Sequence, residues 1–223
     1  MKRTREIEMG SEIRSAIDEL SLVVVKLKPT ADDLDSATHI PTLPFLSVCN
    51  LVVQVLDKIG PTMAVLRQDM DQNIQRLEKV HESDPLVYSN MVEILKKEAD
   101  EGNARKVASC SRAFIWLTRS LDFTVALLQL LLKDFGGNME QVVEEAYNVA
   151  LKPWHGWISS AAYRVALKLV PDNNTLLGIL KAKDEDTEKL KENMQDLILL
   201  LAPLLEKNHS VLKTYGLERI KST

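Results

Sequence analysis

The sequence has few of the residues that build sheets, tight turns and disulfides. Aromatic side chains make up 5% of the 223 residues, and there are eight glycines and two cysteines. Apolar and polar residues do not alternate for more than a few positions, which argues against a β-rich fold. Cys49 and Cys110 are too few and too far apart for a zinc or thioredoxin-type motif. We expect two buried thiols, with a disulfide between them as the less favoured alternative.

An excess of charge of one sign is also lacking. The 28 basic and 32 acidic residues give a net charge of −4, without the basic stripe of a nucleic-acid binder. No signal-type apolar core follows the charged N-terminal residues. The most apolar run, residues 123–132, is far shorter than the roughly 20 residues that a membrane span needs. We therefore expect a cytoplasmic protein that binds no nucleic acid and spans no membrane.

What the chain does contain is helical periodicity over almost its whole length. We predict an all-α fold of about eight helices in a single domain, 1–223, with a motif-bearing core at 40–207 and short polar termini. The longest predicted helix, 104–134, is apolar nearly all round, which places it in the middle of a bundle. Helices are expected over 11–27, 44–59, 61–80, 85–102, 104–134, 138–152, 154–170 and 184–207, with 172–181 as a candidate for a further short one. Ser11 as an N-cap, the Asp84-Pro85 pair and the capping-box pattern that opens with Asn138 mark three of the starts, and the last helix is expected to be kinked or to end near Pro203.

The sequence carries no recognisable catalytic motif. It has no glycine-rich dinucleotide or phosphate loop, no serine-hydrolase elbow and no zinc-protease signature. Its four histidines are scattered, and none has a second His or Cys at metal-ligand spacing. We predict no catalytic residue, no metal site and no cofactor.

Three polar residues share one face of the predicted helix over 61–80. Asp69, Asn73 and Arg76 are spaced i, i+4 and i+7, so they lie within roughly 60° of one another around the helix axis. A carboxylate, an amide and a guanidinium in one row can bind a polyhydroxylated ligand. A solvated helix face with an acid–base pair explains the same pattern, and periodicity alone favours that reading.

Aromatic residues mark two further places. Trp116 lies beside Arg119 in the predicted central helix, and Trp154-His155-Gly156-Trp157 opens a later one. An indole ring is a flat plate that can stack on a sugar, and it also favours the membrane–water interface. His155 can bond a ligand carbonyl or carboxylate. Taken alone, Trp116 is more readily a core residue, and His155 is equally well explained as a capping or core side chain.

In combination, these motifs resemble the glycolipid transfer protein family. Asp69-x3-Asn73-x2-Arg76, Trp116-Leu117-x-Arg119 and Trp154-His155-Gly156-Trp157 occur in the order and at the separations of that family, across about residues 40–175. The resemblance implies a two-layer helical sandwich around an apolar sleeve for lipid chains. It implies non-enzymatic transfer or sensing of glycosphingolipids such as glucosylceramide, one per monomer, during transient contact with a membrane.

The resemblance also assigns roles to residues. In the family, the residue matching Asp69 hydrogen-bonds the ceramide amide and the sugar hydroxyls. The residue matching Asn73 hydrogen-bonds the sugar, and the residue matching Trp116 stacks under the sugar ring. His155 matches the donor to the ceramide carbonyl. Arg76 stands where the family usually has lysine, which keeps the charge but aims the donors differently. The predicted head-group set is Asp69, Asn73, Arg76, Trp116, Arg119, His155 and Tyr215, the last matching a tyrosine near the C-terminus of sugar-binding members.

A sister branch of the family carries ceramide-1-phosphate. It has lysine at the Asn73 position and a pair of arginines in the helix that here carries Trp116, so this chain resembles the glycolipid branch more closely. A ceramide-1-phosphate carrier using Arg112 and Arg119, or a helical adaptor without lipid, stay open as alternatives. Trp157 is the predicted membrane-docking residue. The predicted wall of the hydrocarbon pocket is Phe45, Leu46, Phe123, Leu127, Ala162, Val165 and Ala166.

Overall fold

The computed structural model describes residues 12–27, 39–182 and 185–222, and most of them are helical. These residues form nine α-helices, one 3₁₀ turn (Pro61–Met63) and one isolated bridge between Pro41 and Asn90. The predicted all-α class is confirmed. The helices are α1 (Glu12–Leu27), α2 (Thr42–Ile59), α3 (Ala64–Ser83), α4 (Met91–Asp100), α5 (Cys110–Lys133), α6 (Met139–Ala150), α7 (Trp157–Leu167), α8 (Asn173–Leu180) and α9 (Thr187–Thr214).

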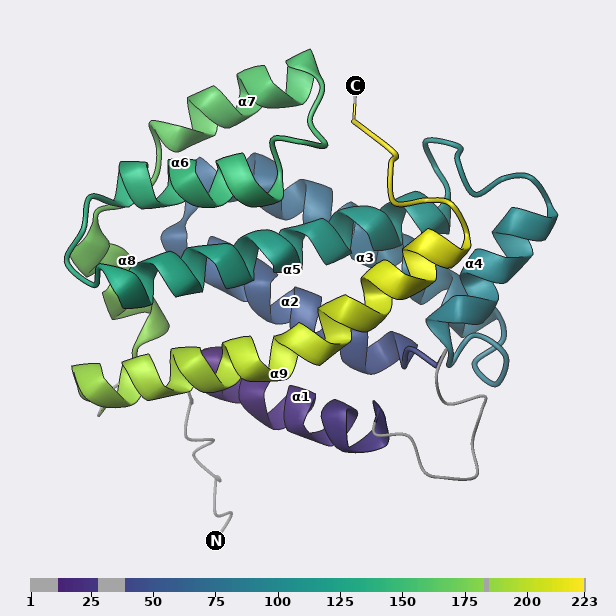
Figure 1. Cartoon of the computed structure of the whole chain (residues 1–223), viewed down its shortest axis with the longest axis horizontal. Coiled ribbons are helices and arrows are strands. Elements are labelled where there is room, and N and C mark those ends of the chain that lie inside the picture. Colours follow the sequence, from purple (N-terminus) through teal and green to yellow (C-terminus); the bar gives the residue numbers. More distant parts are fainter. Residues whose placement is uncertain (1–11, 28–38, 183–184, 223) are drawn as a thin grey trace, which may run out of the picture.

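The helices form two layers (Figure 1). In one layer α5 lies between α9 and α6, and in the other α2 lies between α1 and α3. Contacts of α1 with α9 and of α3 with α5 join the layers. α7 packs on the outer side of α6, and α4 lies near the end of α5 where that helix begins. This is the two-layer helical sandwich that the resemblance implies.

The core lies between the layers, and α5 runs through its middle. α5 contacts α3, α4, α6 and α9, which confirms the central position predicted from its apolar surface. Phe114 of α5 and Phe45 of α2 are both fully buried, with ring centroids 5.2 Å apart. α2 and α5 are long and apolar enough to cross a membrane by length and composition alone. Core helices pass the same test, and both pack against other helices here.

The two cysteines occupy the same core. Cys49 of α2 and Cys110 at the start of α5 are buried and are not bonded to each other. The expectation of two buried free thiols is confirmed.

α4 begins later than the Asp84-Pro85 pattern predicts. Its first residue is Met91, whose N–H donates to the carbonyl of Ile40 at 2.8 Å. Asn90 caps the helix and also accepts from the Ile40 N–H at 3.0 Å. The chain between Pro85 and α4 is thus held against the segment before α2, and this long-range pairing replaces the first turns of the predicted helix.

α5 begins at Cys110, and the predicted start at residue 104 is wrong. Ser109 is the N-cap, and its side chain accepts from the backbone of the third helical residue. The Glu98 carboxylate accepts from the N–H groups of Cys110 and Ser111, both at 2.7 Å. A carboxylate from α4 therefore satisfies the first N–H groups of α5 and complements its dipole.

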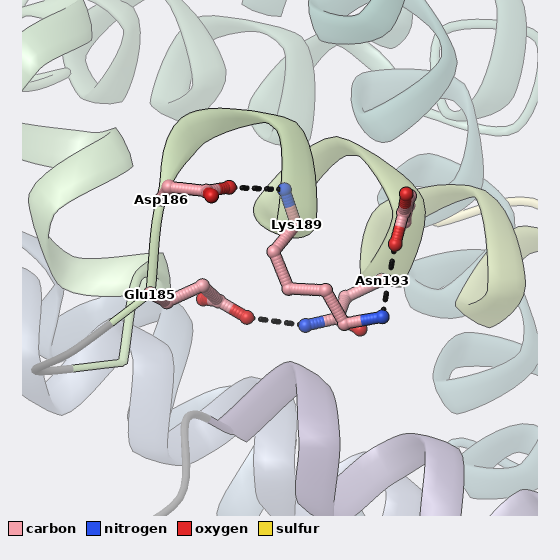
Figure 2. A network of polar contacts seen from close by, with 5 residues as sticks. Glu185, Asp186, Lys189 and Asn193 are labelled. Carbon is pink, nitrogen blue, oxygen red and sulfur yellow. Dashed lines mark hydrogen bonds and ion pairs between the residues drawn. The ribbon is translucent and has the colours of Figure 1, made fainter.

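A polar network fixes the start of α9 (Figure 2). Asp186 caps the helix by accepting from the Lys189 N–H at 2.7 Å. Glu185 and Asn193, both buried, are hydrogen-bonded to each other. The helix therefore starts three residues after the predicted boundary at 184.

α9 also runs further than predicted, to Thr214, with Pro203 inside it. Proline removes one helical hydrogen bond and normally kinks or ends a helix. Here Pro203 is exposed, whereas Leu201 and Leu204 on either side are fully buried. Burial of the apolar face maintains the helix beyond residue 207, the predicted end. The predicted N-cap Ser11 lies outside the described residues.

Candidate functional site

The polar row of α3 forms as helical periodicity predicts. The Asn73 side-chain amide donates to the Asp69 carbonyl at 2.9 Å and lies 3.4 Å from the Asp69 carboxylate. Arg76 lies 3.5 Å from the Asn73 side-chain oxygen. Asn73 is buried, Arg76 is half-buried and Asp69 is exposed. The three side chains are therefore one connected group at the edge of the buried face, with the carboxylate outermost.

The Asp69 carboxylate is partly shielded from water by the protein around it. This shielding raises the pKa of Asp69, and the nearby Arg76 charge opposes the rise. An ionised carboxylate has only acceptor sites, so it suits a partner that offers N–H or O–H donors. The position favours an amide or hydroxyl group over an anion.

Arg76 also ties α3 to the beginning of α5. Its guanidinium approaches the Ser109 carbonyl at 3.5 Å, and the Cys110 thiol donates to the Arg76 carbonyl at 3.7 Å. The planar, multi-donor arginine can reach Asn73 and the α5 cap together, which the single ammonium of lysine does less readily. The arginine at this position thus has a structural partner of its own.

On α5, Arg119 lies between two tryptophan rings. Its guanidinium carbon is 4.8 Å from the centre of the Trp116 ring and 4.3 Å from that of Trp154. Only 3% of the Arg119 surface is exposed. Burial lowers the pKa of Arg119 to about 10, with Arg112 adding to the fall and Asp122 opposing it. The guanidinium stays charged at neutral pH and holds both indoles by cation–π contact.

His155 completes this aromatic group. Its ring centre lies 5.8 Å from that of Trp116 and 5.4 Å from that of Tyr147 on α6. Burial lowers the pKa of His155, and the Arg119 charge lowers it further. The imidazole is therefore neutral at neutral pH, with one N–H donor and one acceptor nitrogen. Its Nδ1 is buried and has no hydrogen-bond partner among the described residues.

The structure thus brings Trp116, Arg119 and His155 together from two parts of the chain. Trp154 belongs to the same group, but it was not among the predicted site residues, although it lies in the motif that drew attention to His155. Tyr215 is placed elsewhere: it ends α9 and lines a recess with Ala99 and Arg105. Its role in the site stays a prediction.

The predicted pocket-wall residues fall into two groups. Phe45 and Leu46 are fully buried in the core, and Phe123 and Leu127 are half-buried against it. Ala162 and Val165 lie instead on the exposed side of α7, and Ala166 is half-buried. In this conformation the α7 residues do not face the core, because α7 packs on α6 through Tyr163, whose ring stacks on Tyr147 at 3.4 Å. Their place in a hydrocarbon pocket stays a prediction.

The exposed side of α7 is apolar. Trp157 and Val165 are 78% and 66% exposed, and Ile158 is also exposed. At 100° per residue these side chains fall within about 100° of one another around the helix axis. Arg164 lies at the edge of this face, and Lys168, the C-cap of α7, lies on the same side at the helix end. Trp157 directly follows the turn that carries His155, so this face borders the aromatic group.

Comparison with known proteins identifies the class to which this fold and site belong. The family model for the glycolipid transfer protein matches residues 40–182. Glycolipid transfer protein 3 of Arabidopsis thaliana is 57% identical over 225 residues, covering 100% of this chain and 97% of that protein. Human pleckstrin homology domain-containing family A member 8 is 30% identical over 186 residues, covering 80% of this chain and 36% of that protein.

Solved structures agree on the fold. A mutant of Arabidopsis accelerated-cell-death 11 complexed with C12 ceramide-1-phosphate aligns with a TM-score of 0.81 at 20% identity, covering 94% of this chain and 98% of that one. The FAPP2 structure, described as selecting simple glycosphingolipids with this fold, aligns with a TM-score of 0.74 at 27% identity, covering 85% and 92%.

The class is therefore that of helical lipid-transfer proteins, which bind a lipid and are not enzymes. Within it, the chain belongs to the glycolipid transfer protein family.

Proposed function

We propose that this protein carries glycosphingolipids such as glucosylceramide, one at a time, between membranes. The observation that supports this cargo best is the pairing of Trp116 with a neutral, half-buried His155, whose buried Nδ1 has no hydrogen-bond partner among the described residues. A half-buried indole offers a plate for a sugar ring. A neutral imidazole beside it can hydrogen-bond a ceramide amide without the charge that an anionic head group would favour.

The α3 row supplies the complementary acceptors. Asp69 is exposed, so its carboxylate can accept from N–H or O–H groups of a lipid head group. Asn73 is buried, with its amide directed at Asp69. When a lipid without matching donors enters, these polar groups lose water without gaining partners, which costs roughly 1–3 kcal/mol for each group. Selectivity then follows from the penalty on the wrong head group.

The hydrocarbon chains need a compartment of their own. Each buried CH₂ is worth about 0.8 kcal/mol, so a free ceramide in water is prohibitively costly. The core between the layers is aliphatic, with Phe45, Leu46, Phe123 and Leu127 at or beside it. We propose that the chains insert between the layers next to these residues.

The apolar face of α7 is the proposed membrane contact. An interfacial helix pairs a buried apolar face with basic residues at its edge and often carries tryptophan, and α7 has both features around Trp157. Docking through this face would bring the neighbouring His155 turn to the bilayer. We further propose that the protein works as a monomer in the cytoplasm.

Transfer between vesicles tests the cargo. Labelled glucosylceramide, galactosylceramide and ceramide-1-phosphate are compared side by side with the wild type and Trp116→Ala. We expect the glycosylceramides to move, and Trp116→Ala to slow them more than the phosphate. If only the phosphate moves, the protein is a ceramide-1-phosphate carrier. If no lipid moves, the adaptor reading replaces the proposal.

The variant Trp157→Ala is the matched control for the loss of an indole. It should slow all three lipids by a similar factor, because it weakens docking and leaves the head-group contacts in place. Equal losses across head groups for Trp116→Ala as well would assign Trp116 a packing role.

A further inference from the structure

The C-terminal segment Gly216–Ser222 crosses the site, where it is held by arginine side chains from α5 and the chain before it and by backbone groups of the turn before α7. It leaves α9 through Gly216, whose φ of 63° is in the left-handed region that glycine adopts without strain. The Leu217 N–H donates to the Leu212 carbonyl at 2.8 Å, and the Gly216 N–H donates to the Lys213 carbonyl at 3.0 Å. This is a Schellman-type helix end, which turns the chain back across the helices.

Two apolar residues anchor the segment. Leu217 is 1% exposed and Ile220 is 8% exposed, so both belong to the core. Their burial fixes the path of the backbone between them independently of the residues that follow. The last described residues can therefore be changed without removing the anchor.

Three arginines spaced seven residues apart donate to the backbone of this one segment. Arg105 bonds the Gly216 carbonyl at 2.7 Å, Arg119 the Glu218 carbonyl at 3.1 Å, and Arg112 the Lys221 carbonyl at 3.3 Å. The spacing of Arg112 and Arg119 places them two turns apart on the same face of α5. Arg119 is also the residue that lies between Trp116 and Trp154, so the segment and the aromatic group share one guanidinium.

The end of the segment reaches the turn that carries His155. The Ser222 N–H donates to the Trp154 carbonyl at 2.9 Å, and the Ser222 hydroxyl accepts from the Gly156 N–H at 3.0 Å. These two bonds bracket His155 on both sides. Within the turn, the Trp154 N–H donates to the Leu151 carbonyl at 2.9 Å. Gly156 has no side chain that could pack and hold the turn in place.

We infer that the segment Gly216–Ser222 is a strap that positions the head-group site, with Ser222 fixing the Trp154–Gly156 turn and hence the direction of the His155 ring. This inference rests on the proposed function and names an element of the same site. Ser222 is a positioning residue: it acts on the lipid through His155. The strap also sets the start of α7, because Gly156 is the N-cap of that helix.

A graded series at Ser222 tests the strap. Ser222→Ala removes the hydroxyl acceptor, Ser222→Pro removes the N–H donor as well, and a chain ending at Lys221 removes both bonds. Ser222→Thr keeps both groups and serves as the rescue. Ser83→Ala, at the exposed end of α3, makes the same chemical change away from the site.

The readouts are thermal unfolding, tryptophan emission and transfer of the three labelled lipids. The chain has three tryptophans. The Trp154 carbonyl accepts from Ser222, Trp157 directly follows the turn, and Trp116 packs on Arg119, so their emission reports on the turn without a label. We expect Ser222→Ala to slow transfer about fivefold, which corresponds to roughly 1 kcal/mol for one hydrogen bond. Losing both bonds should slow it more, with an emission shift and a fall of no more than a few degrees in the unfolding temperature.

Because the strap acts through His155, the loss should be similar for every ceramide-based lipid that the wild type carries, in contrast to Trp116→Ala. Wild-type rates and emission in Ser222→Pro and in the chain ending at Lys221 would overturn the inference while leaving the proposed cargo intact. Loss of transfer that merely tracks a fall in unfolding temperature would also overturn it. If the wild type carries no lipid, the proposed function fails, and the emission of the series still decides whether Ser222 holds the turn.

Discussion

α5 and α7 are both rich in apolar residues, yet the fold uses them in opposite ways. α5 contacts four other helices and places residues such as Phe114 at the centre of the core. α7 packs on α6 with one face and leaves Trp157 and Val165 in solvent. An apolar face that none of the other described helices covers points to a contact outside the molecule. The same composition therefore serves stability in one helix and, we propose, membrane docking in the other.

The largest effect should come from the core side of this comparison. Phe114→Ala removes a fully buried ring that packs on Phe45. We expect a loss of about 3–5 kcal/mol in the free energy of unfolding, because the cavity forms where the surroundings cannot collapse. Urea denaturation measures it. A loss below about 1 kcal/mol would show that α5 is not packed as described.

The next effect concerns the polar row of α3. Asp69→Val should reduce glycosylceramide transfer more than about tenfold, because bonds to a charged group are worth roughly 1.5–3 kcal/mol each. Stability should change little, since Asp69 is exposed. Asp71→Val, two residues along the same helix and on a different face, is the control. Normal transfer by Asp69→Val would remove Asp69 from the site.

If the apolar face of α7 contacts the membrane, a charge on it should weaken membrane docking without destabilising the fold. Val165→Asp places a charge in the middle of the exposed apolar face, and we expect vesicle association to fall about tenfold, or roughly 1.4 kcal/mol. Val107→Asp is the control, because Val107 is 81% exposed in the chain between α4 and α5. Co-sedimentation with vesicles measures both variants. Equal binding by the two would place the membrane contact elsewhere.

The smallest effect lies where α5 meets α9. His209 lies 3.0 Å from Asp122, and that hydrogen bond raises the pKa of His209, with burial opposing it. Because the pKa of His209 is higher in the folded than in the unfolded protein, the protonated ring stabilises the fold. This stabilisation is complete below the unfolded pKa of about 6.5 and disappears as the pH rises through the folded pKa. His209→Gln should therefore lower the unfolding temperature more at acidic than at alkaline pH. The pair is partly exposed, so we expect less than about 1 kcal/mol.

Local sequence pattern was enough to predict most of the helices and the polar row of α3. The Asn138 capping box was predicted, and the Asn138 side chain accepts from the Gln141 N–H at 3.1 Å. The Asp69, Asn73 and Arg76 row follows from helical spacing alone. Boundaries failed where distant chain segments decide them, as at α4, where pairing with Ile40 competes with helix formation.

The rest of the site had no local signal. Trp154 pairs with Arg119 across 35 positions of sequence, and Ser222 bonds Gly156 across 66. Nothing in the pattern around Ser222 distinguishes it from any other terminal serine. Such contacts depend on where Gly216 turns the chain and on which core residues anchor it.

The sequence by itself determined the all-α class, the central place of α5, the polar row of α3 and, through its motifs, membership of the family. These follow from 3.6-residue periodicity and from residue types at fixed spacing, which act over a few turns. Only the tertiary structure decided that Arg119 lies between two indoles, that α7 exposes its apolar face, and that the C-terminal segment crosses the site. Burial, cation–π contact and long-range hydrogen bonds depend on distances between segments, and those distances exist only once the helices have packed.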